Sequence, residues 1–392
     1  MKRIAVIGAG AAGCFCAAEL RRRRPAVKVD VYESGPKPLA KVAITGGGRC
    51  NLTNSFEGIR SLGEAYPRGE RLMKRLLRVF SQEDTWRWFE DAGVPLVLQD
   101  DHCVFPRSQD AMDIVHALLR RMEGVNLLLR TPVHSIGPDL TVDGEAYDAV
   151  VVTTGGAPKG LPLLEGLDLE WVPTLPSLFT FTIQDEGLRA LMGLVVEATV
   201  SIPGTTFKAD GPLLITDWGL SGPAVLKLSS YAARHLHDAG YKAPLSVNWL
   251  SLSEAETRAL LEELSTANPR KQVSNTPPAG LQARLWNYLT VKAGLRLDIR
   301  WAELGSKGLN KLVNTLAQDS YTIAGKTKFR DEFVTCGGVA LSNLNPATLE
   351  SKQYPGLYFA GEVLDIDAIT GGFNLQAAWT TGYVAAQSIA SK

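Results

Sequence analysis

The stretch that decides the fold is Ile4-Ala5-Val6-Ile7-Gly8-Ala9-Gly10-Ala11-Ala12-Gly13, near the start of the 392-residue chain. Its first four residues are a continuous apolar run, typical of a parallel strand buried on both faces. A GxGxxG turn follows at once, and residues 14–20 are rich in alanine and aliphatic side chains, which predicts a helix. Residues 27–32 predict a second strand, and Glu33 comes directly after it. This order predicts a dinucleotide-binding βαβ unit.

Each residue of this motif has a predicted physical role in binding the dinucleotide. Gly8 permits the tight turn, Gly10 lets the backbone approach a pyrophosphate, and Gly13 lets the helix pack closely on the strand. The free N–H groups at the helix start face the phosphates. Glu33 can accept hydrogen bonds from the ribose hydroxyls, and its charge repels a 2′-phosphate. The residues assigned to the dinucleotide here are Gly8, Gly10, Ala11, Ala12, Gly13, Glu33 and Ser34.

Two later segments indicate which dinucleotide is bound. Residues 150–156 form a second apolar strand that ends in a small-residue turn, and residues 356–362 form a third that ends in Gly-Glu. In large FAD enzymes this last acid reaches the ribityl or phosphate region. The N-terminus of the next helix, here after residue 370, stabilises negative charge on the reduced flavin. The sequence therefore predicts FAD, with further contacts from Val133, Thr154, Gly155, Gly156, Gly361, Glu362, Gly372, Phe373, Asn374, Leu375 and Ala378.

Four segments carry a resemblance to a known family: TGGGRCNLTN at residues 45–54, VFP at 104–106, GLSGP at 219–223, and residues 356–378. They resemble the BaiN/RdsA-type NAD(P)/FAD-dependent oxidoreductases, which are themselves similar to aminoacetone oxidase. The resemblance spans nearly the whole chain. It implies that the loop at 45–54 passes over the flavin and its phosphates.

The residues of that loop are compatible with such a role. Three glycines allow close backbone approach and an anion-binding nest of N–H groups, and Arg49 offers a planar donor fork. The alternative is a glycine-rich surface loop whose asparagines cap turns. The residues assigned to the cofactor here are Thr45, Gly47, Gly48, Arg49, Cys50 and Asn51.

The sequence departs from the family pattern at two positions. Asp217 stands where a histidine commonly precedes GLSGP, and Asn343 stands where an acid is common after the GGV segment. Both departures put an inherited catalytic role in doubt, so the sequence assigns no general acid or base. Arg49, Asn51 and Asp217 are the polar candidates for catalysis.

The middle of the chain has a different pattern from its two ends. Residues 178–183 alternate apolar and polar side chains, and residues 195–202 and 211–216 continue in that style, which predicts a small antiparallel sheet or barrel. Residues 253–317 are mostly helical in pattern. The predicted fold is α/β: a discontinuous Rossmann-like FAD-binding domain with an inserted β-barrel-like plus helical domain. The predicted FAD-binding domain combines residues 1–176 with 326–392, and the insertion consists of an antiparallel β segment at 177–252 and a mainly helical segment at 253–325.

Other residues that could carry chemistry favour structural roles. The five cysteines have no CxxC spacing, so a dithiol relay is not predicted, and packing is the predicted role of Cys50. The histidines do not cluster with acids or cysteines, and Asp365 and Asp367 lack further ligands, so no metal is predicted. The basic residues of 68–78 predict the solvated face of an amphipathic helix: Arg68, Arg71, Lys74, Arg75 and Arg78.

Charge and hydropathy limit the expected partners. Lys and Arg number 41 and so do Asp and Glu, which gives no basic excess, and we expect a small-molecule substrate and no nucleic acid. The longest uncharged stretch, residues 368–391, contains Asn374, Gln376 and Gln387 and is not predominantly apolar, so we expect no membrane partner. The odd cysteine count favours reduced thiols in the cytoplasm. The oligomeric state stays open.

The predicted reaction is hydride transfer between FAD N5 and a small or mid-sized organic substrate, in one version an enone-type reduction fed by NAD(P)H. The chain has no second GxGxxG, so a nicotinamide would dock only transiently. Three alternatives remain from the sequence: an FAD-dependent amine oxidase or dehydrogenase, a flavin-dependent nucleic-acid-modifying enzyme, and a non-catalytic flavoprotein.

Overall fold

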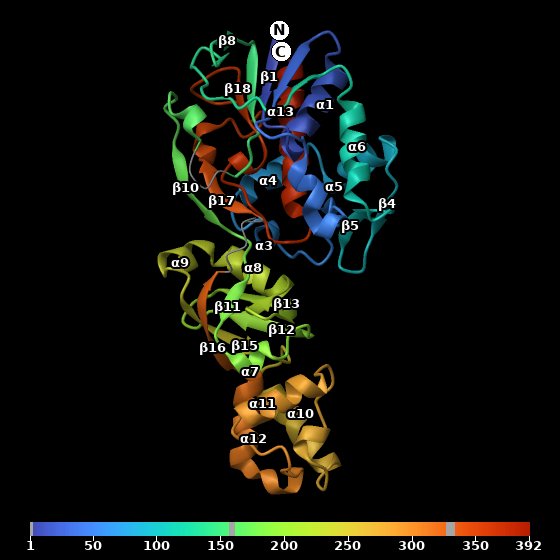
Figure 1. Cartoon of the computed structure of the whole chain (residues 1–392), viewed down its shortest axis with the longest axis vertical. Helices are drawn as coiled ribbons and strands as arrows, with labels where there is room; N and C mark the ends of the chain where they lie inside the picture. The colour runs from blue at the N-terminus through green and yellow to red at the C-terminus, as the bar shows by residue number, and fades with distance from the viewer. Residues whose placement is uncertain (1–2, 157–160, 327–333) are drawn as a thin grey trace. The chain divides into compact units, whose positions relative to one another are not determined.

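The computed structural model describes residues 3–156, 161–326 and 334–392 (Figure 1). The chain divides into two compact units, of which the first combines residues 1–176 with 334–392 and the second contains residues 177–333. Within the described ranges, none of the helices combines the length and the apolar character that crossing a bilayer requires.

A five-stranded parallel sheet forms the centre of the first unit. Its strand order is β18-β9-β1-β2-β6, so β1 lies in the middle. The apolar runs predicted from the sequence form three of these strands, because continuous Val, Ile and Leu can be buried on both faces. The strands are β1 (Arg3–Ile7), β2 (Lys28–Tyr32), β6 (Asn126–Leu128), β9 (Ala149–Val152) and β18 (Leu357–Phe359).

Two helices from opposite ends of the chain pack together against this sheet. They are α1 (Ala11–Arg23) and α13 (Phe373–Ala390), drawn in blue and red in Figure 1. A Cβ placed on Gly382 of α13 would lie 2.7 Å from the carbonyl oxygen of Ala12, so the two backbones are in direct contact. Phe15 and Trp379 are fully buried between them. The N-terminal and C-terminal segments of the discontinuous domain are therefore held together by a shared hydrophobic core.

The remaining elements of the first unit surround this centre. A small antiparallel sheet has the order β3-β5-β4, β7 and β8 form a hairpin, and β10 pairs with β17. The helices are α2 (Ala40–Ile44), α3 (Leu62–Ala65), α4 (Glu70–Leu76), α5 (Gln82–Asp91) and α6 (Ala111–Arg121). The strands are β3 (Thr53–Asn54), β4 (Leu96–Leu98), β5 (Cys103–Pro106), β7 (Thr141–Val142), β8 (Glu145–Ala146), β10 (Trp171–Pro176) and β17 (Thr335–Val339).

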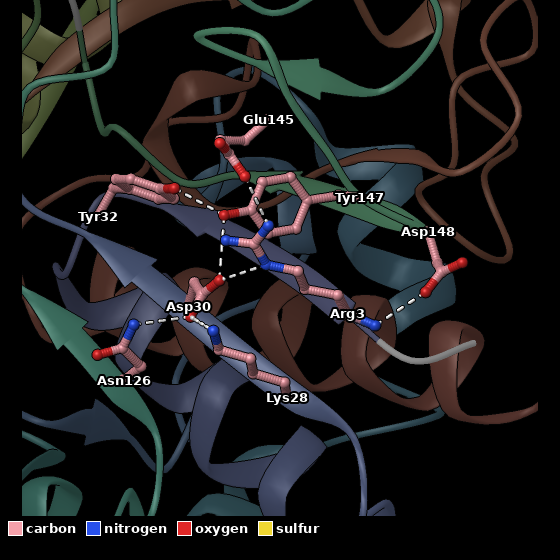
Figure 2. Close-up of polar contacts among 8 residues, drawn as sticks. All are labelled: Arg3, Lys28, Asp30, Tyr32, Asn126, Glu145, Tyr147 and Asp148. Atoms are coloured by element: carbon pink, nitrogen blue, oxygen red, sulfur yellow. Dashed lines mark hydrogen bonds and ion pairs between the residues drawn. The ribbon is translucent and has the colours of Figure 1, made fainter.

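A buried polar network ties the β7–β8 hairpin to the parallel sheet. Figure 2 shows Asp30 of β2 at its centre, with a fully buried side chain. Arg3 Nε donates to Asp30 Oδ2 at 2.8 Å, and the Tyr147 hydroxyl donates to the same oxygen at 3.1 Å. Asn126 Nδ2 donates to Asp30 Oδ1 at 2.8 Å, and the Tyr32 and Tyr147 hydroxyls are 2.6 Å apart. A charged residue in the middle of an apolar strand is thus satisfied by hydrogen bonds from β1, from β6 and from the segment between β8 and β9.

The Asp30 carboxylate is expected to stabilise the folded state at neutral pH and to lose this stabilising effect in acid. Burial alone raises the pKa of its carboxyl, but hydrogen bonds from Asn126, Arg3 and Tyr147 outweigh burial, so the net pKa is lowered. Such a group contributes stability that is full above its unfolded pKa, about 3.9, and is lost as pH falls through the folded value. In urea unfolding, we expect the stability difference between the wild type and Asp30→Asn to shrink between about pH 5 and pH 2.

A neighbouring carboxylate provides the control for this pH effect. Glu145 also pairs with Arg3, at 2.9 Å, but its side chain is 66% exposed. Glu145→Gln should therefore cost less than about 1 kcal/mol at any pH. A wild-type advantage over Asp30→Asn that stays constant down to about pH 2 would contradict the assignment.

The second unit is built on a closed antiparallel barrel. Its strand order is β11-β14-β13-β12-β15-β16, and β16 pairs back with β11. This confirms the predicted barrel-like insertion, although the last strand follows the helical stretch and does not precede it. The strands are β11 (Phe181–Ile183), β12 (Val195–Ser201), β13 (Lys208–Ile215), β14 (Gly219–Ser221), β15 (Ala243–Asn248) and β16 (Asp319–Lys326).

The helices of the second unit share one hydrophobic core with the barrel. Trp249 after β15 and Trp286 of α11 are both fully buried in this core. The backbone N–H of Trp249 donates to the carbonyl of Leu316 in α12 at 2.8 Å. The helices are α7 (Glu186–Arg189), α8 (Pro223–Tyr231), α9 (Ala233–Asp238), α10 (Glu254–Ala267), α11 (Ala283–Lys292) and α12 (Trp301–Ala317).

Candidate functional site

The predicted cofactor residues follow the carboxyl ends of the parallel strands, at one edge of the sheet. Gly8 follows β1, Glu33 follows β2, and Thr153 follows β9. Thr153 Oγ1 donates to the Gly8 carbonyl at 2.8 Å, which joins two of these ends directly. Beyond β18, a Cβ on Gly361 would lie 2.8 Å from the Cβ of Ala12 in α1. From β1 the strand order continues to β2 on one side and to β9 on the other. Parallel α/β sheets bind ligands at the carboxyl end of the strands where the order changes direction in this way.

The three glycines of the first turn have different surroundings. A Cβ on Gly13 would lie 1.9 Å from the Gly8 carbonyl oxygen, so this position is closed by the protein itself. Gly8 has a φ of +108°, which favours glycine. No atom of the described residues lies within 4 Å of a Cβ built on Gly10, so its backbone is open to a ligand. The first turn of α1 carries no acidic residue, and no side chain in the described ranges caps it, so its N–H groups can receive an anion.

Glu33 and the residues predicted beside it lie together. Glu33 Oε2 accepts the N–H of Ala9 at 3.0 Å, and Oε1 accepts the N–H of Gly35 at 2.7 Å. The N–H of Thr131 donates to the Glu33 carbonyl at 2.8 Å, which brings the half-buried Val133 into the same region. The exposed Ser34 follows Glu33 in sequence. The carboxylate is therefore held at the glycine turn, and its contact with a ribose stays a prediction.

The glycine loop after α2 is bent by three successive positive φ angles. These are +59° at Gly46, +70° at Gly47 and +83° at Gly48, a run that side chains other than hydrogen oppose. Within 4 Å of a Cβ on Gly47 or Gly48 there is no atom from the described ranges of the chain. The N–H of Cys50 closes the loop on the carbonyl of Thr45 at 3.0 Å. The loop thus presents open backbone, as an anion-binding nest requires.

Arg49 lies against an aromatic ring. Its guanidinium carbon is 4.6 Å from the centre of the Phe105 ring, and Nη1 is 3.4 Å from Gln109 Oε1. The side chain is exposed. The Phe105 ring therefore supports the guanidinium by a cation–π contact. A phosphate or carboxylate contact of Arg49 stays a prediction.

Asn51 and the start of α13 meet at a point that is short of hydrogen bonds. Asn51 Oδ1 is buried and has no hydrogen-bond partner among the described residues. A Cβ on Gly372, the residue before α13, would lie 2.7 Å from this oxygen. Within the same ranges no side chain caps α13, whose first N–H groups lack intrahelical partners. Asn51 Oδ1 needs a donor, and the first N–H groups of α13 need an acceptor. The edge of a polar ring can satisfy both.

Glu362 lies over the small-residue turn after β9. A Cβ on Gly156 would come within 2.8 Å of Glu362 Oε1, and one on Gly155 within 3.6 Å of Oε2. Glu362 Oε1 also accepts the N–H of Thr335 at 2.8 Å, and Lys41 Nζ lies 3.4 Å from Oε2. Thr154 Oγ1, on the same turn, is buried without a hydrogen-bond partner in the described chain.

The predicted residues at the start of α13 are mostly engaged in packing. The amide of Asn374 closes a two-way bond with the backbone of Ala368, each contact at 2.9 Å. Phe373 is buried, and its carbonyl accepts the hydroxyl of Tyr66 at 2.9 Å. Ala378 is buried and Leu375 is half-buried. These side chains hold the start of α13 in place. The backbone N–H groups of its first turn are therefore the groups that remain available to bind a cofactor.

The two departures from the family pattern have different settings. Asp217 lies in the second unit, exposed in the turn between β13 and β14, where its carbonyl accepts Arg189 Nε. Asn343 lies in the first unit, where its amide accepts the N–H of Glu170 at 3.0 Å and donates to the Glu170 carbonyl at 2.7 Å. Asn343 therefore has a structural role as both acceptor and donor. An ionised carboxylate at this position could only accept. A substrate contact of Asp217 stays a prediction.

Sequence reasoning was wrong about one basic residue. Arg68 was expected on a solvated helix face, but it precedes α4 and forms a two-bond ion pair with Asp367. The Arg68 side chain is 14% exposed and that of Asp367 is fully buried. Their separation of 299 residues hid the pairing. The other four members of the group are exposed, as predicted.

The site fits FAD better than a metal. Open glycine backbone, two uncapped helix starts and two orphaned buried oxygens match a ligand with phosphates and hydrogen-bonding rings. In the described ranges no group of three or more His, Cys, Asp or Glu is placed to hold a metal ion.

All five cysteines should be inert in the folded protein. Each is buried and none is in a disulfide. Burial raises the pKa of Cys50 to about 12 and that of Cys103 to about 11, so both are protonated thiols near neutral pH. We expect Ellman's reagent to detect no fast thiol in the native protein and five after unfolding. A fast-reacting Cys50 would contradict the packing role.

The fold and the site define an FAD-dependent oxidoreductase. The chain belongs to the HI0933-like Rossmann-domain family, whose model matches residues 2–388. It is 31% identical to the ribosomal RNA dihydrouridine synthase of Escherichia coli K12, over 98% of this chain and 97% of the relative. It is 27% identical to the 3-dehydro-bile acid delta(4,6)-reductase of Clostridium scindens, over all of both chains. The structure of 3-ketosteroid delta1-dehydrogenase from Sterolibacterium denitrificans shares the fold, with a TM-score of 0.50, 15% identity and full coverage of both chains.

Proposed function

We propose that this enzyme reduces a carbon–carbon double bond conjugated to a carbonyl group. The supporting observation is that two full-length relatives are named for such reductions. Dihydrouridine results from adding hydrogen across the uracil double bond next to a carbonyl, and a 3-dehydro bile acid carries a ketone that can conjugate with ring double bonds. The substrates differ greatly in size, but hydride addition to an electron-poor alkene is common to both.

The chain's own residues would hold and orient the cofactor. FAD, when bound, supplies hydride from N5 of its reduced ring. Gly10 and the start of α1 would receive the pyrophosphate, and Glu33 the adenosine ribose. The loop from Thr45 to Asn51 and the turn at residues 154–156, with Glu362, would surround the flavin end. The uncapped start of α13 would stabilise negative charge on the reduced ring.

Uracil in RNA is a second candidate substrate. The zero net charge of the chain led us to expect no nucleic-acid partner, but the E. coli relative is named for ribosomal RNA and matches at 31% identity. If this candidate is right, ribosomal RNA from cells that lack the gene should lose a dihydrouridine, and mass spectrometry should detect its return when the gene is restored. Ribosomal RNA with an unchanged dihydrouridine content would remove this candidate.

The reaction class is tested by anaerobic absorbance titration of the yellow holoenzyme. We expect NADH or NADPH to bleach the flavin band, and cyclohex-2-enone or uridine monophosphate to restore it. Cyclohexanone and dihydrouridine monophosphate, which lack the double bond, are the matched controls and should restore nothing. Bleaching by primary amines but not by NAD(P)H would instead identify an amine oxidase or dehydrogenase and overturn the proposal.

A further inference from the structure

The zero net charge of the chain conceals a strongly basic segment in the second unit. Residues 268–311 contain eight Lys and Arg but only two Asp and Glu, a net charge of +6. The preceding helix α10 has the opposite character, with four glutamates and one arginine in residues 254–267. These two segments pack together, since α10 contacts α12 (Figure 1). Charge is therefore segregated within one helical layer.

Two of the eight cations have partners within the second unit and are set aside here. Lys292 lies 2.7 Å from the buried Asp319 and over the ring of Tyr321. Arg284 donates to the carbonyl of Ala190 at 3.0 Å. The other six, all exposed, are called the basic strip below: Arg270, Lys271, Arg296, Arg300, Lys307 and Lys311.

The backbone brings the segments that carry the basic strip next to α12 (Trp301–Ala317), which contains Lys307 and Lys311. A Cβ on Gly294 would lie 3.5 Å from Lys311 Nζ, and one on Gly308 would lie 3.5 Å from Leu295, so the segment after α11 runs beside this helix. Arg300 then precedes α12 and bridges to Gln272. The N–H of Trp301 donates to the carbonyl of Lys271 at 3.1 Å, which adds the 270–271 turn to the same end.

The two acids of the segment reduce the charge of the basic strip only partially. Asp298 lies 3.3 Å from Arg296, and Glu303 accepts the backbone N–H of Arg300 at 3.2 Å. Six cations and two anions leave a net charge of +4. Lys307 and Lys311 are one helical turn apart and repel each other, which weakens an isolated helix by about 0.2–0.5 kcal/mol. A ligand with closely spaced negative charges would remove this repulsion.

We propose that the basic strip binds the phosphate backbone of RNA. The inference rests on the second candidate under the proposed function, since a uracil within RNA brings a polyanion with it. Arg and Lys are the side chains that neutralise phosphates, and the basic strip offers both types, on α12 and on the segments that lead up to it. Such contacts carry no sequence information, so they would position an RNA whose base is selected elsewhere.

The test compares two triple variants of the holoenzyme. One is Arg296→Gln with Lys307→Gln and Lys311→Gln. The matched control, Arg71→Gln with Lys74→Gln and Arg78→Gln, removes the same charge from the exposed face at α4. A fluorescein-labelled single-stranded RNA of about 30 nucleotides is the probe, at several salt concentrations. We expect the first variant to flatten the slope of log K against log salt by about 2, at about 0.7 for each lost contact. The control should keep the wild-type slope, and both should keep the wild-type flavin spectrum.

Three results would overturn the proposal: equal losses in the two variants, no salt-dependent RNA binding by the wild type, or binding to phosphatidylserine-rich vesicles in place of RNA. Reduction of cyclohex-2-enone separates this outcome from the proposed function. An enzyme that reduces the enone but does not bind RNA would refute the basic strip alone. One that binds RNA through the basic strip but reduces no conjugated alkene would refute the reaction class alone.

Discussion

Gly13→Ala is expected to destroy the folded state of the first unit. The added Cβ would lie 1.9 Å from the Gly8 carbonyl oxygen and 2.5 Å from Thr153 Oγ1. Neither atom can move easily, because Gly8 directly follows the central strand β1 and Thr153 Oγ1 donates to the Gly8 carbonyl. Overpacking in a core typically costs about 1–3 kcal/mol, and a clash with backbone belongs at or above the upper end. Urea unfolding should show a loss of at least about 3 kcal/mol or no cooperative transition.

Gly10→Ala is the matched variant, because it adds the same methyl group three residues earlier. Its Cβ would have no neighbour within 4 Å among the described residues, and the backbone φ of −84° suits alanine. Loss of glycine before α1 should lower the stability of the apoprotein by less than about 1 kcal/mol. The methyl group would occupy the space assigned to the pyrophosphate, so FAD affinity should fall about tenfold or more. Wild-type FAD affinity in this variant would refute the assigned position of the phosphates.

The sequence predicted the features of the fold that depend on local pattern. Residues 150–152 are continuous valine and form the interior of β9, because such a run is stable only between two covered faces. The helix predicted to begin after residue 370 is α13, which starts at Phe373. It was also predictable that the candidate residues after these strands would lie together, because parallel strands bring their carboxyl ends to one edge.

Features that depend on distant pairing could not be predicted. Residues 319–326 form β16 and close the barrel by pairing with β11 and β15, although helices α10, α11 and α12 lie between β15 and β16 in the chain. The partners of Asp30 come from three separate segments, so a lone acid in an apolar strand gave no sign of them. The net charge of the whole chain likewise says nothing about local charge, because a sum over the chain removes the position of each charge. Counting charge by segment would have revealed residues 268–311.

Breaking the Arg68–Asp367 ion pair is expected to be the most costly single polar change in the first unit. Burial alone lowers the pKa of Arg68, but the hydrogen bonds to Asp367 outweigh burial and the net shift of the pKa is upward. Asp367→Asn leaves the Arg68 guanidinium in place but removes the charge of its hydrogen-bonded partner. Removing one partner of a buried ion pair typically costs about 3–5 kcal/mol, whereas replacing both by apolar groups can be nearly neutral. We therefore expect urea unfolding to show a large loss for Asp367→Asn and for Arg68→Met.

The double variant Arg68→Met with Asp367→Leu isolates the pair. It should recover most of the stability, with a coupling free energy of about 0.5–3 kcal/mol from the double-mutant cycle. The pair also holds the turn before α13, because Ala368 follows Asp367 and exchanges two hydrogen bonds with Asn374. FAD should consequently dissociate faster from both single variants than from the wild type. If the single variants unfold at the wild-type urea concentration and keep FAD, the ion pair does not anchor the start of this helix.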